Sequence, residues 1–336
     1  MDGDFLAIIE THDLTRKFGD LIAVDHVSFS VKEEEIFGFL GPNGAGKTTA
    51  INMLTTLLRP NEGSATVAGF DVIKEANKVR STIGLVPQDL TVDEDLTGME
   101  NMILQARLYH VPMSKAKPRI EEVLELLGLT GAAKRKVETY SGGMRKRLEL
   151  GTGLIHYPKM LFLDEPTLGL DVQTRVAMWD YIRKLRDEQK ITIFLTTHYM
   201  EEADALSDRI AIIDHGKIIA QGTPHELKES LGGDIIEITP YEENQDIKDV
   251  LTSVPTVKEV KNTGNLYRLK VVNGEETIPR IMEKICENKI KISKVSLIEP
   301  SLDQVFLEYT GKTIRETESG REDVRRMRRY LRRVRD

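Results

Sequence analysis

The sequence predicts an α/β fold followed by a small α+β domain, and three observations lead to this prediction. A glycine-rich loop separates an apolar strand from a helix within residues 36–58, and two later apolar runs, at 160–163 and 191–195, end in polar residues. After residue 231, strands and helices alternate in the order β-α-β-β-α-β. The chain has 336 residues and 40% hydrophobic content, enough for one large core and a smaller one.

Composition excludes several classes of protein. There is no run of about 18 apolar residues and no signal-peptide layout at the start, so we expect a cytoplasmic chain without a membrane span. Cys286 is the single cysteine, which excludes an internal disulfide and a cysteine-based metal site. The formal net charge is -7, while residues 321–336 carry a local +5, which leaves -12 for the rest. An acidic body argues against a broad nucleic-acid-binding face.

The glycine-rich loop fits the phosphate-binding pattern G-x-x-x-x-G-K-[ST] without a gap. Its glycines let the backbone turn tightly and aim N–H groups at phosphate oxygens, and the following helix adds its positive N-terminus. We expect Lys47 to reach the β- and γ-phosphates of a nucleotide and Thr48 to offer its hydroxyl to Mg²⁺. The residues of this nucleotide site are Gly41, Pro42, Asn43, Gly44, Ala45, Gly46, Lys47, Thr48 and Thr49.

The region before this loop, residues 5–40, is predicted to be rich in strands, because apolar and polar residues alternate most clearly at 23–31. Phe18 stands in a loop between two such runs. An exposed Phe18 could stack on an adenine ring, whereas a buried one would only pack beneath the turn. The residues by themselves leave these two alternatives open.

Gln88 follows a short strand predicted at 83–86, where its amide oxygen could reach a metal ion or an attacking water. Seen alone, it is more often a loop residue. From about residue 90 to 157 the pattern becomes helical, with helices expected at 99–109 and 118–127, so we predict a helical insert within the α/β domain.

Ser141, Gly142 and Gly143 begin a helix inside this insert. Free N–H groups and a hydroxyl at a helix start form a second possible anion site. The alternative is an ordinary serine N-cap, which this segment favours when it is seen alone.

Acidic and histidine side chains end the two later apolar strands. Asp164 and Glu165 close the run at 160–163, where Asp164 would hold Mg²⁺ through its water shell and Glu165 could polarise the water that attacks the γ-phosphate. His198 follows the run at 191–195 and could contact the γ-phosphate or orient that water. A lone histidine is usually a polar residue that only makes structural hydrogen bonds, but the position of His198 after a buried strand favours a role in catalysis.

The end of the chain is predicted to form two further parts. Residues 232–312 have the split-βαβ order of a small separate domain without an evident catalytic cluster. Residues 313–336 form a basic tail in which apolar residues fall on one helical stripe. This tail could touch anionic lipid as an amphipathic helix, or it could be a solvated end.

Taken in order, these segments resemble an ATP-binding-cassette (ABC) ATPase over residues 5–225. Within that family the chain is most similar to the ATPase subunits of daunorubicin-type drug exporters, through the motifs at 140–145, 179–182 and 299–306. The general signature begins with Leu and ends in Gln, where this chain has Tyr140 and Met144, a difference that concerns subtype. The matching landmarks are the loop at 41–48, Gln88, Ser141 with Gly142 and Gly143, Asp164 with Glu165, Gly169 to Asp171, and His198.

The resemblance implies an architecture. It implies a P-loop NTPase core with an antiparallel β subdomain and a helical insert, together 1–231, and a ferredoxin-like α+β domain at 232–312. ATP and Mg²⁺ would be the cofactors. Two copies would pair head to tail around two ATP molecules, so that Ser141 and Gly143 of one subunit face Lys47 of the other and Asp171 crosses the interface. Gln88 would link the core to the insert.

The resemblance also implies partners. A separate multi-span membrane permease would be driven by ATP hydrolysis, and the chain would lie on the cytoplasmic face of the cell membrane. The alternative is a soluble ABC ATPase that acts on the ribosome or on nucleic acid, suggested by the basic tail. The translation-factor relatives carry two cassettes and the chromosome-maintenance relatives carry long coiled coils, and this sequence has neither feature.

Overall fold

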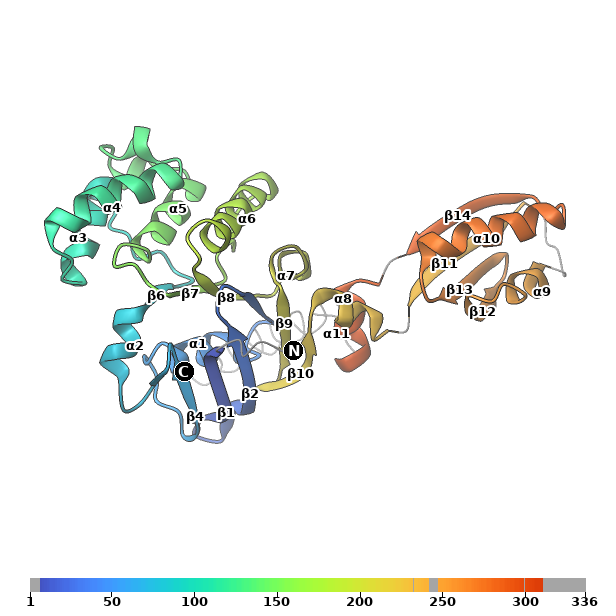
Figure 1. Cartoon of the computed structure of the whole chain (residues 1–336), viewed down its shortest axis with the longest axis horizontal. Coiled ribbons are helices and arrows are strands. Elements are labelled where there is room, and N and C mark those ends of the chain that lie inside the picture. Colours follow the sequence, from blue (N-terminus) through green and yellow to red (C-terminus); the bar gives the residue numbers. More distant parts are fainter. Residues whose placement is uncertain (1–6, 232, 242–246, 299, 311–336) are drawn as a thin grey trace, which may run out of the picture. The chain divides into compact units, whose positions relative to one another are not determined.

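The computed structural model describes residues 7–231, 233–241, 247–298 and 300–310 (Figure 1). The chain divides into two compact units, the first of which runs to Gln221, while the second starts at Gly222. The division precedes residue 231, where the sequence placed it, because helix α8 (Pro224–Glu229) contacts α11 (Leu302–Thr310) of the second unit. The tail expected at 313–336 lies outside the described residues.

A six-stranded sheet forms the centre of the first unit. Strands β6, β7, β8, β3 and β9 pair in parallel with their neighbours. Every residue of β3, β7 and β8 is buried, as expected where both faces of a parallel sheet are covered. In spatial order the strands are β10 (Lys217–Gly222), β9 (Arg209–Asp214), β3 (Ile36–Leu40), β8 (Thr192–Thr197), β7 (Met160–Asp164) and β6 (Ile83–Val86).

An antiparallel sheet accounts for the strand-rich start of the chain. Strand β1 pairs antiparallel with both β2 and β4, so the predicted antiparallel subdomain is confirmed. The strands, in spatial order, are β2 (Leu21–Lys32), β1 (Ala7–Phe18), β4 (Glu62–Val67) and β5 (Phe70–Asp71). Helices α1 (Lys47–Leu54) and α2 (Ala76–Thr82) belong to the same part of the chain.

Alternate residues of the central strands supply two different cores. In β7, Leu161 and Leu163 join the cluster formed with the helical insert, whereas Met160 and Phe162 join the one formed with the antiparallel sheet. Side chains of a strand point alternately to its two faces, so an unbroken apolar run serves both layers.

The helical insert contains α3 (Gly98–Leu108), α4 (Met113–Leu126) and α5 (Gly142–Thr152), with two short 3-10 turns at Thr130–Ala132 and Val137–Thr139. The start predicted for α4, residue 118, was wrong: the helix begins at Met113 and keeps Pro118 inside it. Buried Ala116 and Ile120 lie on either side of this proline, so packing of the apolar stripe outweighs the usual preference of proline for a helix start. Helix α6 (Val172–Asp187) and α7 (Met200–Leu206) complete the first unit.

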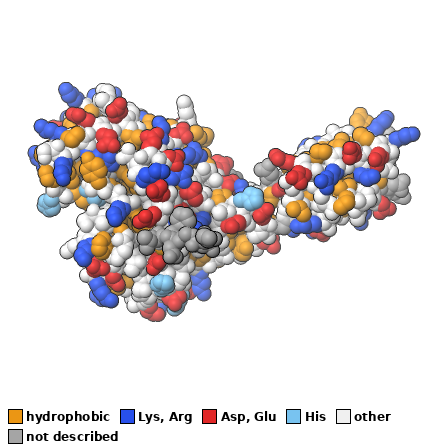
Figure 2. Space-filling model, in the orientation of Figure 1, with side chains coloured by type: hydrophobic (Ala, Val, Ile, Leu, Met, Phe, Trp, Pro, Cys, Tyr) orange, Lys and Arg blue, Asp and Glu red, His pale blue; other side chains and the backbone are white. Residues whose placement is uncertain are grey.

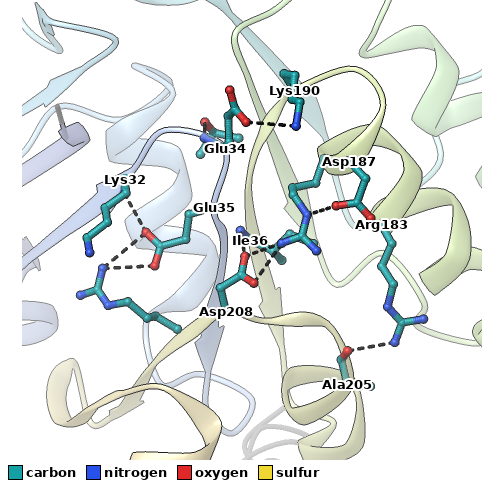
Figure 3. A network of polar contacts seen from close by, with 12 residues as sticks. Lys32, Glu34, Glu35, Ile36, Arg183, Asp187, Lys190, Ala205 and Asp208 are labelled. Atoms are coloured by element: carbon teal, nitrogen blue, oxygen red, sulfur yellow. Dashed lines mark hydrogen bonds and ion pairs between the residues drawn. The ribbon is translucent and has the colours of Figure 1, made fainter. Parts of the chain in front are cut away.

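Polar contacts tie together the amino ends of the parallel strands (Figure 3). Ile36, the first residue of β3, donates its N–H to Asp208 at 2.8 Å. Asp208 also accepts from Arg186 of α6 through both oxygens, at 2.9 and 2.8 Å. Glu35 accepts from Arg209 at 3.2 and 3.4 Å. Hydrogen bonds and ion pairs therefore connect this edge of the sheet to α6.

The second unit has the predicted β-α-β-β-α-β order. All strand pairings in its four-stranded sheet are antiparallel, with the spatial order β12-β13-β11-β14 of a ferredoxin-like fold. Buried residues of β11 pack with those of α9 and α10 in one cluster, so both helices cover the same face. The elements are β11 (Asp234–Pro240), α9 (Ile247–Thr252), β12 (Val257–Thr263), β13 (Leu266–Val271), α10 (Gly274–Glu287) and β14 (Ile292–Ile298).

Candidate functional site

The glycine-rich loop connects β3 to α1 and is wedged between neighbouring strands. Gly46, the N-cap of α1, has a φ of 111°, which favours glycine. A Cβ at Gly46 would lie 2.3 Å from the carbonyl oxygen of Ala23, and a Cβ at Gly41 would lie 2.2 Å from that of Ile213. Both positions therefore demand glycine because the backbone of β2 or β9 passes so close.

Lys47 is buried beneath this loop, with only 4% of its surface exposed. Its Nζ donates to the carbonyl oxygens of Gly41 at 2.7 Å and Pro42 at 3.2 Å, and it pairs with Glu165 Oε1 at 3.0 Å. Thr48 is exposed in the first turn of α1, whose leading N–H groups have no acceptor within the helix. The loop thus places a cation, a hydroxyl and backbone donors together, a set that fits a nucleotide phosphate and its metal ion.

Asp164 and Glu165 end β7 and are held by one residue of the adjacent strand. The hydroxyl of Thr196 in β8 donates to Asp164 at 2.5 Å, and the Glu165 N–H lies 3.1 Å from both the carbonyl and the hydroxyl oxygen of Thr196. Glu165 has a φ of 51°, an uncommon conformation for a residue with a side chain. The two consecutive carboxylates have different partners, since Asp164 accepts from Thr196 whereas Glu165 contacts Lys47 and His198, as two different roles would require.

Glu165 lies between two cationic or proton-donating groups. His198 Nδ1 is 2.5 Å from Glu165 Oε2, on the opposite oxygen from Lys47. Burial pushes the pKa of Glu165 upward, but the hydrogen bond from His198 and the charge of Lys47 outweigh it, so the pKa ends below its ordinary value. Glu165 is therefore a carboxylate at neutral pH, the form that accepts a proton.

Sequence reasoning missed a buried acid behind this cluster. Glu202 in α7 is fully buried and accepts hydrogen bonds from Thr167 at 2.7 Å and from the Trp179 indole at 3.1 Å. Burial raises its pKa, and its hydrogen-bond donors offset only part of that effect. An acid in the first turn of a helix is ordinarily a solvated partner of the helix dipole, so the sequence carried no signal of its burial.

Phe18 and Gln88 are both accessible. Phe18 is 47% exposed at the end of β1, and the Arg16 guanidinium lies 4.6 Å from its ring centroid. The structure thus favours the exposed alternative for Phe18, on the hairpin whose strand β2 carries Ala23 against the loop at Gly46. Gln88 is exposed beyond β6, and its carbonyl oxygen accepts from Lys146 Nζ at 2.6 Å.

Ser141 and Asp171 form a second group. Ser141 is the N-cap of α5 and accepts from the Met144 N–H at 3.3 Å, while Asp171 is the N-cap of α6 and accepts from the Thr174 N–H at 3.0 Å. A Cβ at Gly143 would lie 2.4 Å from Thr174, so the two helix starts are in close contact. Figure 1 shows α5 and α1 on either side of β6, β7 and β8. The Ser141 group therefore belongs to the starts of α5 and α6, whereas Lys47 belongs to α1.

Comparison with known proteins identifies the family. Residues 24–168 match the family described as "ABC transporter". Residues 222–310 match the family of the C-terminal domain of DrrA1-3-like ATP-binding proteins. The doxorubicin resistance ATP-binding protein DrrA of Mycobacterium tuberculosis is 43% identical over 301 residues, which cover 87% of this chain and 89% of that protein. The chain belongs to the ABC transporter ATPases. This ABC ATPase therefore hydrolyses ATP, as the resemblance implied.

Two further relatives extend the comparison. The Nod factor export ATP-binding protein I of Burkholderia orbicola is 37% identical to this ABC ATPase over 313 residues, 93% of this chain and 99% of that protein. A dimeric ATP-binding cassette in a post-hydrolysis state with ADP and Pi is 26% identical, with a TM-score of 0.57 over 64% of this chain and 98% of that one. In the described part of this ABC ATPase, every helix is too short or too polar to cross a membrane.

Proposed function

We propose that this ABC ATPase drives a separate membrane permease that exports drugs or other hydrophobic compounds. The proposal is supported by relatives that are named for resistance to doxorubicin and for Nod factor export and that match nearly the whole chain. It is also supported by the second unit, which resembles the C-terminal domain of DrrA-type proteins. We assign residues 232–312 to an accessory domain and place the protein on the cytoplasmic face of the cell membrane.

The observation that carries the proposed chemistry is the buried Lys47–Glu165–His198 cluster. Lys47 is 3.0 Å from Glu165, so a γ-phosphate that takes this place on Lys47 releases one oxygen of the carboxylate. Glu165 then accepts a proton from the attacking water, while His198, on the other oxygen, holds its orientation. Burial strengthens each of these interactions because little water screens them.

Mg²⁺, when bound, neutralises charge on the β- and γ-phosphates. Thr48 and Asp164 would hold it directly or through water, with Gln88 as a further oxygen ligand. Within the described ranges no cluster of three or more Asp, Glu, His or Cys side chains could hold a metal by itself. This agrees with an ion that keeps water and phosphate oxygens as most of its ligands.

A second copy of the chain would complete the site. Ser141, Gly142 and Asp171 are exposed, and they stand at the starts of α5 and α6 rather than on the loop that carries Lys47. Serine hydroxyl and N–H groups at the start of α5 suit the γ-phosphate of a nucleotide bound by a partner. We therefore propose two ATP molecules between two head-to-tail subunits, an arrangement supported by the dimeric cassette found among the similar structures.

The nucleic-acid alternative has less support. On the face drawn in Figure 2, acidic and basic side chains are interspersed over the described residues rather than gathered into a basic stripe. The basic tail lies outside these residues, and its proposed contact with anionic lipid depends on the local +5 charge at 321–336. Equal binding of the full chain and a chain ending at residue 320 to anionic vesicles would overturn that contact.

The test of the proposed function is an affinity purification of tagged protein from detergent-solubilised native membranes. The purification is repeated with the Glu165→Gln variant and MgATP, because slow hydrolysis should keep the ATP-bound dimer intact. Mass spectrometry identifies the partners. We expect a multi-span protein in stoichiometric amount. Recovery of ribosomal proteins or nucleic acid without any membrane protein would instead establish the alternative.

A further inference from the structure

Three charged side chains of α5 bind the segment that begins at Gln88. Lys146 Nζ donates to the Gln88 carbonyl oxygen at 2.6 Å. Glu149 accepts the N–H groups of Thr91 at 2.9 Å and Val92 at 3.0 Å, and it also accepts the Thr91 hydroxyl. One further ion pair, Arg145 to Glu94 at 2.5 Å, lies at the end of the segment. We name residues 88–94 the linker segment.

The burial of two of these side chains distinguishes this grip from surface contacts. Lys146 is 7% exposed and Glu149 is 1% exposed. They lie three positions apart, so they share one face of α5. A buried charge is costly unless hydrogen bonds compensate it. Lys146 and Glu149 are compensated mainly by backbone atoms of the linker segment. The linker segment therefore has one well-determined position relative to α5.

Helix α5 and the linker segment each begin at a residue of the proposed nucleotide sites. Ser141 is the N-cap of α5, and the linker segment starts at Gln88. Strand β6 ends at Val86, so Pro87 alone separates the central sheet from the linker segment. Any rotation of the insert against the sheet at this connection is thus confined to the residues around Pro87, and Gln88 moves with α5.

We propose that Glu149, assisted by Lys146, is a positioning residue that makes Gln88 and the Ser141 loop move as one body. Contact of Gln88 with the γ-phosphate on its own subunit then sets the orientation in which Ser141 meets the nucleotide of the other subunit. This inference rests on the proposed function, because it assumes that Gln88 and Ser141 act at two different nucleotides.

The test uses the full chain with Glu165→Gln, to prevent turnover, and compares Glu149→Ala with Glu149→Gln. Glutamine can accept both backbone N–H groups and donate to the Thr91 hydroxyl, so it should rescue the alanine defect. For Glu149→Ala we expect the ATP concentration at half-maximal dimerisation to rise about tenfold, measured by analytical ultracentrifugation. Binding of a fluorescent ATP analogue to the monomer should change less than about twofold, because the side chain of Glu149 bonds to the linker segment and not to the loop that carries Lys47.

The matched control is Glu35→Ala. Glu35 is also a buried acid of the first unit that accepts a backbone N–H, from Lys32 at 2.7 Å, but it lies at the amino edge of the sheet. It should lower stability without changing the ATP dependence of dimerisation. Equal defects in Glu149→Ala and Glu35→Ala, or no rescue by Glu149→Gln, would reduce Glu149 to a structural residue and overturn the proposal.

Hydrogen exchange separates this inference from the proposed function. In the parent variant, MgATP should slow exchange both in residues 88–92 and in residues 141–146. In Glu149→Ala, at the ATP concentration that half-saturates dimerisation of the parent, only the first segment should respond. If the parent does not dimerise with MgATP, the proposed head-to-tail arrangement fails, and the inference that rests on it fails with it; if the parent dimerises, the exchange pattern of Glu149→Ala decides the coupling separately. A response of both segments in Glu149→Ala contradicts the coupling.

Discussion

The two edges of the parallel sheet use charged residues in different ways. At the amino edge, Asp208 binds an arginine and a backbone N–H of the same structure, and it is itself 45% exposed on its side chain. At the carboxyl edge, Lys47 and Glu165 are 4% and 5% exposed, and Glu165 has an uncommon backbone conformation. The charged groups Asp208 and Glu35 of the first edge are paired with arginines of the same structure, whereas the second edge holds buried charges whose partners a ligand can replace. The comparison indicates that charged residues at the amino edge stabilise the fold, whereas those at the carboxyl edge are available for binding and catalysis.

The largest effect should come from Glu165→Gln at the carboxyl edge. Because the amide cannot accept a proton from water, we expect kcat to fall about 10²–10⁴-fold. Affinity for MgATP should be kept or improved, since Lys47 no longer has a carboxylate partner at 3.0 Å. Phosphate release and calorimetric binding of MgATP measure the two quantities. Turnover at the parent rate would show that another group activates the water.

Lys47→Ala should lower nucleotide affinity. The phosphate loses a charge-assisted hydrogen bond, an interaction worth about 1.5–3 kcal/mol, so MgADP affinity should fall about 10- to 100-fold. Lys17→Ala is the control, since Lys17 pairs with Glu62 at the surface at 2.6 Å. Calorimetry with MgADP compares the two variants. Parent-like binding by Lys47→Ala would remove Lys47 from the phosphate site.

Asp208→Ala should show the opposite behaviour at the amino edge. It leaves the N–H of fully buried Ile36 without its acceptor, which should lower the free energy of unfolding by about 1–3 kcal/mol. MgATP affinity of the folded protein should not change. Urea unfolding and calorimetry measure these quantities, with Asp180→Ala, which pairs with Arg183 on the exposed face of α6, as control. A loss of affinity comparable with that of Lys47→Ala would contradict the division between the edges.

The smallest effect concerns Glu202 and pH. Burial raises its pKa above the ordinary value of 4.5, so the folded chain binds this proton more tightly than the unfolded chain does. The free energy of unfolding should therefore fall as pH rises above the ordinary value, until the folded-state pKa is passed. Glu202→Gln should remove this part of the slope above the ordinary value, where Glu165 is already ionised.

Urea unfolding at several pH values measures that slope. The single tryptophan, Trp179, donates to Glu202 at 3.1 Å and gives a fluorescence signal beside it. Equal slopes in the parent and in Glu202→Gln would contradict the prediction.

Local patterns were enough to predict much of this molecule. The apolar runs at 160–163 and 191–195 are buried strands, the glycine-rich loop joins a strand to a helix, and the last domain has the predicted order of elements. These features depend on residues close in sequence. One helix start was less predictable: α4 begins at Met113, before Pro118, because buried Ala116 and Ile120 continue one apolar face across the proline.

What the sequence by itself determined is the chemistry of each segment, since a glycine that needs a positive φ, a lysine beside it and an acid after an apolar strand are local properties. Only the tertiary structure decided which segments meet. Thr196 holds Asp164, Glu202 binds Trp179, and Glu149 holds the linker segment, although these partners are 23 to 58 residues apart. Such contacts depend on the order of strands and on packing between layers, which propensity and periodicity do not encode.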